Sequence, residues 1–189
     1  MNPNPNDELP SLVWIDCEMS GLGPNDKILE IAVLITDNDL NVVAEGPNLI
    51  INQPESLLAN MNDWCKEHHG ASGLTDAVRQ STISTEQAGQ IVFDFIKHYI
   101  PDKGIGILAG NSVHADKIFL EREMGQVIDW LHYRIVDVST VKELAKRWCP
   151  REFERAPRKL GMHRAMDDIK ESIAELKYYR EAVFFGKPE

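Results

Sequence analysis

The chain has 189 residues, of which 43% are hydrophobic and 26% charged, and this composition is typical of one globular domain. No apolar run reaches the roughly 20 residues of a membrane-spanning helix, and the first residues lack the apolar core of a signal peptide. A net charge of −10 argues against a surface for long nucleic acid, because such surfaces carry an excess of Lys and Arg. A polyanionic partner should therefore be short, or be bound locally through metal ions.

Residues 1–10 are expected to form a flexible N-terminal lead, and residues 11–189 a single domain. No internal repeat and no linker rich in Gly, Ser or Pro divides the second range. The three cysteines are scattered and never form a Cys-x-x-Cys pair, which is typical of a reducing compartment. We therefore expect a cytoplasmic protein.

The first half of the chain predicts strands followed by helices. Residues 12–19 are expected to form a strand, and residues 27–51 an antiparallel meander of a strand, an Asp-Asn-Asp turn, a second strand and a short further strand. A helix is expected from Pro54 to about His68. Ser84–Gln87 matches a capping box, which starts a helix with an apolar face that runs to Tyr99.

In the second half, strands and helices alternate. The expected elements are a buried strand at 104–111, a helix at 114–124, a strand at 133–139, a helix through Trp148 capped by Ser139 or Thr140, a loop containing Pro150 and Pro157, and a last helix at 165–184. Three antiparallel strands followed by two further strands among helices predict an α/β fold. Its mixed sheet should have the meander at one edge and helices on both faces.

Asp16 and Glu18 lie two residues apart at the end of the first expected strand. Side chains at i and i+2 of a strand project to the same side, so these two carboxylates should stand next to each other. Ligand sites in such folds lie beyond the strand ends, where loops gather. Their charge can be balanced by a nearby Arg or Lys, or by a divalent cation such as Mg²⁺ or Mn²⁺.

Further acids lie where helices begin. Asp116 is in the first turn of one expected helix, and Asp167 and Asp168 open the last one. Each of them, taken alone, is explained by the helix macrodipole. His163 precedes Asp168 by five residues, so the two side chains can converge only if His163 lies in the loop before the helix. A single histidine is more often an ordinary surface or packed residue.

Together, these residues resemble the catalytic set of the DEDDh exonucleases, which have the ribonuclease-H-like fold. The acids and the histidine of that family would be Asp16, Glu18, Asp116, Asp168 and His163. The segments WIDCEMSGL, ILEIAVLITD, LAGNSVHADKIFL and HRAMDDIKESI narrow the likeness to the oligoribonuclease family, over nearly the whole chain. The resemblance implies a 3′→5′ exoribonuclease domain over residues 11–189. It would degrade short oligoribonucleotides, especially dinucleotides, to 5′-mononucleotides at the last step of RNA decay.

The resemblance also implies two divalent ions, Mg²⁺ or Mn²⁺. Asp16, Glu18 and Asp168 would hold one ion, and Asp16 would share the second with Asp116. His163 would act as the general base that takes a proton from the attacking water. The family spacing from His163 favours Asp168 over Asp167 as the ligand.

For the substrate, the resemblance implies two groups of residues and a homodimer. Leu22 and Trp64 would form a wedge against which the bases stack, although Trp64 also fits a helix core. The 5′ phosphate would be capped by Ser112, Tyr133, Arg134, Ser139 and Thr140. Tyr133 and Arg134 would reach the other subunit's site, although an edge-strand Tyr-Arg pair and an ordinary helix cap would explain the same residues.

Two other interpretations fit parts of the pattern. The chain could be a different DEDDh exonuclease, such as a DNA proofreading subunit or a tRNA-trimming nuclease. It could also be an inactive module of the same fold that binds RNA or protein, although all five expected active-site residues are intact.

The Cys-Lys-Glu-His-His run at 65–69 lacks a second cluster to complete a zinc site, so it is interpreted as a helix C-terminus. Glu30 is expected to be a buried acid that orients its neighbours.

Overall fold

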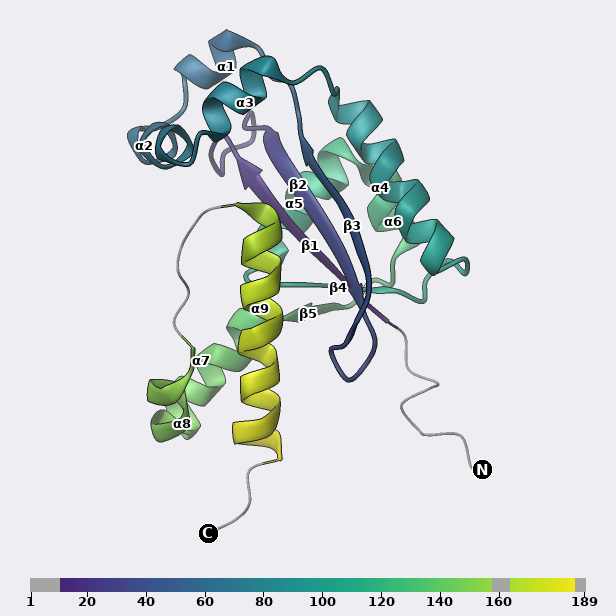
Figure 1. Ribbon diagram of the computed structural model, residues 1–189, viewed down its shortest axis with the longest axis vertical. Helices are drawn as coiled ribbons and strands as arrows, with labels where there is room; N and C mark the ends of the chain where they lie inside the picture. Colours follow the sequence, from purple (N-terminus) through teal and green to yellow (C-terminus); the bar gives the residue numbers. More distant parts are fainter. Residues whose placement is uncertain (1–10, 158–163, 186–189) are drawn as a thin grey trace.

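The computed structural model describes residues 11–157 and 164–185, built around a five-stranded mixed sheet (Figure 1). The strands, in the order β3-β2-β1-β4-β5 across the sheet, are β1 (Leu12–Met19), β2 (Ile28–Thr36), β3 (Val42–Ile50), β4 (Ile107–Gly110) and β5 (Ile135–Asp137). β1, β2 and β3 pair antiparallel, whereas β4 pairs parallel with both β1 and β5. The predicted mixed sheet is therefore confirmed, with the meander at one edge.

Burial along the strands follows their place in the sheet. All nine residues of β2 are buried, because helices cover both of its faces. β3 is largely exposed and contains Pro47, which an edge strand tolerates because it has no partner on one side. The turn before β3 is closed by Asp37, whose Oδ1 accepts hydrogen bonds from the N–H groups of Asp39 and Asn41. The separate short strand expected after the second one is wrong, since residues 42–50 form one strand.

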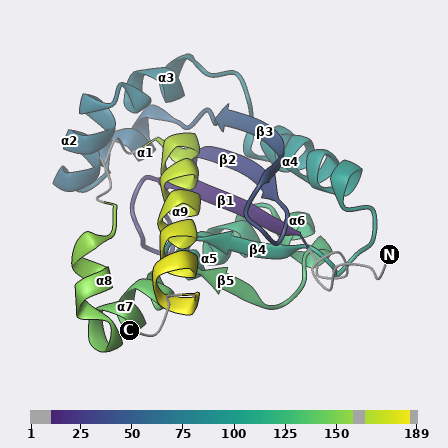
Figure 2. The ribbon, with the colours of Figure 1, turned by 60° about the horizontal axis from the view of Figure 1, so that its bottom comes forward.

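Helices cover the two faces of the sheet, as predicted. One face packs against α4 (Thr85–Tyr99), α5 (His114–Glu123) and α6 (Gly125–Trp130), and the other against α9 (Ala165–Tyr179). Figure 2 shows α9 crossing the strands, and α4 next to the edge strand β3. A π-helical turn at Arg180–Phe184 extends α9 to the expected end of the last helix. Within residues 11–157 and 164–185, no helix is both long enough and apolar enough to cross a membrane.

A third group of helices packs against Leu29 at one end of the sheet: α1 (Glu55–Ala59), α2 (Asp63–Ala71) and α3 (Leu74–Gln80). The single helix predicted from Pro54 to His68 is wrong, because the chain breaks between α1 and α2. Asn62 causes the restart by capping α2, its side chain accepting a 2.8 Å hydrogen bond from the N–H of Cys65. α3 was not expected.

Of the remaining helices, α4 and α7 (Val138–Trp148) were predicted, and α6 and α8 (Pro150–Arg155) were not. The capping box of α4 is present, with the Ser84 and Gln87 side chains each accepting from the other's N–H. α7 is capped by Asp137 and not by Ser139 or Thr140, because the strand before it ends at Asp137. α8 lies where a loop was expected, and α6 was also missed. Helices of six residues are too short to show a periodic apolar pattern.

An ion pair fixes the start of α9 on the sheet. Glu30 of β2 is fully buried, and Arg164 donates to its carboxylate through Nε at 3.0 Å and Nη2 at 3.0 Å. The pairing agrees with the expected orienting role of Glu30. Because Arg164 precedes the first turn of α9, this contact also determines where the acids of that turn lie.

We predict that Arg164→Ala lowers the free energy of unfolding by about 3 kcal/mol, because it leaves the Glu30 carboxylate buried without its counter-charge. The matched control is Lys170→Ala on the same helix, whose pair with Glu45 is exposed and should contribute less than about 1 kcal/mol. Urea unfolding followed by circular dichroism measures both. Equal losses in the two variants would contradict the prediction.

Candidate active site

Three carboxylates converge where β1 ends and α9 begins. Asp16 and Glu18 come from β1, Asp168 comes from the first turn of α9, and one oxygen of each lies within 4.8 Å of the others. Figure 1 shows the start of α9 beside the C-terminal half of β1. The alternation of strand side chains thus brings Asp16 and Glu18 together as the sequence predicted. Asp167 is exposed and lies outside this group.

Asp116 of α5 is a fourth acid that contacts β1. It is 6% exposed in the first turn of α5, and its Oδ1 accepts a 2.9 Å hydrogen bond from the N–H of Cys17. That N–H belongs to the residue between Asp16 and Glu18. Burial raises the pKa of Asp116 to about 7, although the hydrogen bond from Cys17 opposes the rise.

Negative charge dominates this site. Burial raises the pKa of Glu18 to about 8, and the carboxylates of Asp168, Glu30 and Asp116 add to the rise. Arg164 lowers the pKa of Glu18, but its guanidinium is bonded to Glu30. Carboxylate oxygens gathered in this way have the donor chemistry that Mg²⁺ and Mn²⁺ prefer. The residues therefore fit a divalent metal site.

A pocket of about 400 Å³ opens beside Glu18. Its lining residues come from the end of β1, the loop after it and α2: Glu18, Met19, Gly21, Leu22, Asn62, Trp64, Cys65 and His69. Leu22 is 78% exposed and Trp64 is 53% exposed, so the alternative of Trp64 as a helix-core residue is wrong. The Trp64 ring stacks on His68, with ring centroids 4.0 Å apart.

His69 is a site residue that the sequence analysis missed. It lies in the last turn of α2, as expected for the 65–69 run, but its side chain is buried and faces the acids. Its Nε2 lies 2.9 Å from the carbonyl oxygen of Met19, and its Nδ1 lies 3.9 Å from Glu18 Oε2. The i, i+4 spacing from Cys65 places both on one buried helix face, and this was the available signal.

The residues expected to cap a phosphate fall into two groups. Asp137 Oδ1 accepts hydrogen bonds from the Ser112 N–H at 2.9 Å and from the Ser139 hydroxyl at 2.6 Å, which brings these two serines together. Ser112 has a left-handed φ of 58°. Thr140 is exposed next to Ser139.

Tyr133 and Arg134 form the second group, on the exposed segment before β5. The Arg134 guanidinium lies 5.0 Å from the centre of the Tyr133 ring. Within the described ranges, neither residue forms a hydrogen bond or ion pair with the three clustered acids. His163, the expected general base, lies outside the described residues.

Comparisons of sequence assign the chain to a family of nucleases. Residues 13–176 match the RNase_T family model, described as an exonuclease. The chain is 58% identical to the mitochondrial oligoribonuclease of Homo sapiens over 177 residues, which cover 93% of this chain and 74% of that protein. It is 49% identical to the oligoribonuclease of Vibrio parahaemolyticus over 175 residues, which cover 92% of this chain and 96% of that protein.

Solved structures with the same fold include two forms of exonuclease I. The E. coli enzyme in complex with a dT13 oligonucleotide superposes with a TM-score of 0.69 at 15% identity, over 93% of this chain and 42% of that chain. The enzyme of Methylocaldum szegediense gives a TM-score of 0.65 at 16% identity, over 92% of this chain and 41% of that chain. This chain thus spans less than half of either exonuclease I, and the likeness concerns the fold alone.

We predict that the metal-free protein loses stability as the pH rises from about 4.5 to about 8. The pKa of Glu18 is about 8 in the folded protein and near its ordinary value of 4.5 in the unfolded chain, so the folded state binds the proton more tightly. The stabilisation is complete below pH 4.5 and is lost as the pH passes 8. Its size is on the order of a few kcal/mol. Urea unfolding in EDTA at several pH values measures it.

Glu18→Gln is the matched variant for this experiment, because the amide keeps the shape of the side chain and cannot titrate. Its unfolding free energy should decline less between pH 4.5 and 8 than that of the unmodified protein. Glu67→Gln, at an exposed position of α2, should leave the decline unchanged. Parallel pH profiles for Glu18→Gln and the unmodified protein would rule out Glu18 as the cause.

Proposed function

The chain belongs to the oligoribonuclease family of metal-dependent exoribonucleases, and we propose that it releases 5′-mononucleotides from the 3′ ends of short RNA, dinucleotides above all. One observation carries the proposal. Glu18 belongs both to the carboxylate cluster and to the pocket that Leu22 and Trp64 line. A base in that pocket would place the adjoining phosphate next to the acids.

Asp16, Glu18 and Asp168 would hold one divalent ion, Mg²⁺ or Mn²⁺, and Asp16 and Asp116 would hold a second. Bound ions of this kind stabilise negative charge on the reacting phosphate and lower the pKa of the attacking water. Glu18 and Asp116 must lose their protons to serve as ligands, because only ionised carboxylates bind such cations well.

The protein's own side chains would orient the reaction. The buried His69 lies next to Glu18, with Nδ1 3.9 Å from Glu18 Oε2, and would help to orient that carboxylate. His163 is proposed as the general base from its spacing to Asp168, since a near-neutral pKa suits proton transfer. Trp64 offers an exposed ring for a base, and such stacking contributes about 1–3 kcal/mol per base.

Ser112, Ser139 and Thr140 would bind the 5′ phosphate of the substrate, with Tyr133 and Arg134 supplied by the other subunit of a homodimer. The contacts of Asp137 with both serines support a shared site for the first group. The exposure of Tyr133 and Arg134 supports a role in contacts beyond their own subunit. Arginine suits phosphate recognition because its guanidinium can donate two parallel hydrogen bonds.

A cytoplasmic location is also proposed. Cys17 and Cys65 are buried free thiols, and Cys149 is a third free cysteine, which suits a reducing compartment. The human and mouse relatives are named as mitochondrial proteins, so fractionation of the source cells should compare both compartments.

Incubation with 5′-labelled RNAs of two to seven nucleotides tests the function. With Mg²⁺, the dinucleotide should be cleaved fastest and should yield 5′-mononucleotides, and EDTA should stop the reaction. Preference for a long RNA or for single-stranded DNA would indicate a different DEDDh exonuclease. No release of mononucleotide with either Mg²⁺ or Mn²⁺ would indicate an inactive binding module.

Neighbouring aspartates at the start of α9 provide a matched pair of variants. Asp168→Asn should lower kcat by at least about a hundredfold, because it removes one of the three clustered carboxylates. Asp167→Asn should retain activity within about twofold, because Asp167 is exposed and stands outside the cluster. Equal losses in the two variants, measured on a dinucleotide with Mg²⁺, would contradict the proposed ligand set.

A further inference from the structure

The loop between β1 and β2, residues 20–27, carries Leu22 and is folded around one carboxylate. Asp26 Oδ1 accepts a 2.7 Å hydrogen bond from the Ser20 hydroxyl, and Asp26 Oδ2 accepts a 2.8 Å hydrogen bond from the Gly23 N–H. Gly21 is required here, because a Cβ at that position would lie 2.5 Å from Asp26 Oδ2. The loop therefore has a defined shape even though Leu22 itself is 78% exposed.

Arg122, at the end of α5, fastens this loop from outside. Its Nη1 donates a 2.8 Å hydrogen bond to the Pro24 carbonyl, and its Nη2 donates to the Asp26 carbonyl. The guanidinium also lies 4.5 Å from the centre of the Phe119 ring. A planar group with donors on two nitrogens can span two carbonyls, which the single ammonium of a lysine cannot do with the same geometry.

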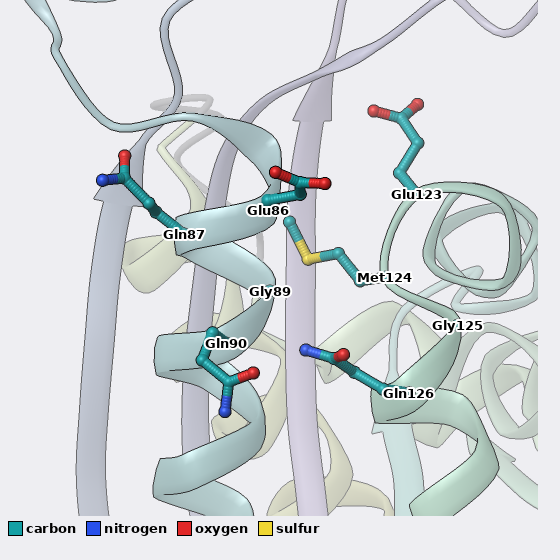
Figure 3. A pocket seen from close by; sticks show the side chains of 8 residues that line it. All are labelled: Glu86, Gln87, Gly89, Gln90, Glu123, Met124, Gly125 and Gln126. Carbon is teal, nitrogen blue, oxygen red and sulfur yellow. The ribbon is translucent and has the colours of Figure 1, made fainter.

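Glu123 keeps the Arg122 guanidinium in place. Its Oε1 accepts a 3.0 Å hydrogen bond from Arg122 and lies 4.0 Å from Lys27 Nζ, at the end of the same loop. The Glu123 side chain is only 3% exposed. Figure 3 shows Glu123 at the edge of the cavity between α4 and α6, with its carboxylate lying apart from Gln90 and Gln126.

The same helix also contacts the end of β1 through Asp116. Asp116 in the first turn of α5 accepts from the Cys17 N–H, and Arg122 in the last turn holds Pro24 and Asp26. Six residues of α-helix separate the two contacts by about 9 Å along the axis. α5 thus fixes the position of the Leu22 loop relative to the carboxylates.

We propose that Arg122 is a positioning residue that sets the place of Leu22 and thereby the preference for dinucleotides. The inference rests on the proposed function, in which the bases of the substrate stack against Leu22 and Trp64. Arg122 acts only through the loop, so its loss should weaken binding of a substrate with two bases. Hydrolysis of a phosphodiester without a base makes no contact with Leu22 and should be unaffected by the loss of Arg122.

A double-mutant cycle tests this role. Leu22→Ala and Arg122→Lys should each raise KM for a 5′-phosphorylated diribonucleotide about tenfold, and the double variant should be no worse than either single one. The kcat/KM for bis(p-nitrophenyl) phosphate, a phosphodiester without a base, should stay within about twofold in Arg122→Lys. Non-additive effects confined to the two-base substrate show that Arg122 acts through Leu22.

Arg180→Lys is the matched control, because Arg180 fastens the β2–β3 turn through the carbonyl and carboxylate of Asp39 in the same manner. It should change neither substrate's kinetics. Ser20→Ala is a second variant, since it loosens the loop without touching α5, and it should also raise KM for the diribonucleotide.

The outcomes separate the inference from the proposed function. If Leu22→Ala raises KM but Arg122→Lys and Ser20→Ala do not, the positioning role is wrong and the role of Leu22 stands. Additive effects, or an equal loss of ester hydrolysis in Arg122→Lys, also overturn the positioning role. If Leu22→Ala leaves KM unchanged, the positioning role of Arg122 and the binding role of Leu22 are both wrong. If the unmodified protein cleaves no diribonucleotide, the proposed function itself is wrong.

Discussion

The structure depends on holding mutually repelling carboxylates together at one end of its central sheet. Asp16 and Glu18 are neighbours on one strand, and Asp168 is brought to them from a helix about 150 residues further along the chain. The pKa of Glu18, raised to about 8, reflects how poorly this place accommodates another negative charge without a cation. The packing of α9 against β1 and β2 must supply the energy that keeps the cluster assembled.

Among the described residues, Arg164 is a nearby cation that is engaged elsewhere. It lowers the pKa of Glu18, but its Nε and Nη2 both donate to the buried Glu30. A buried carboxylate requires such a partner, so the arginine is committed to the fold. Of the two ways of balancing Asp16 and Glu18 that the sequence left open, the contacts of residues 11–157 and 164–185 favour a divalent ion.

Long periodic segments could be predicted from the sequence, and short irregular ones could not. β1, β2, α4 and α9 follow apolar patterns that a single sequence displays, and the spacing of Asp16 and Glu18 needs only the alternation of a strand. Trp64 illustrates what was missed. Its exposure follows from the break that Asn62 introduces, and a capping asparagine inside an apolar pattern gives a weak signal. His69 was missed because its partner Glu18 is distant in sequence.

An acidic protein can bind a short polyanion if its attractive contacts are local. At physiological ionic strength, charges farther apart than about 8 Å are largely screened, so the net charge of −10 matters less than the groups that touch the substrate. A dinucleotide has few phosphates, and those can be met by bound cations and a few donors. In the proposed function, its bases are recognised in the pocket beside Glu18, where Leu22 and Trp64 are exposed. A long RNA would place further phosphates near the acidic surface. The negative charge of the protein would repel those phosphates, so it disfavours a long substrate more than a short one.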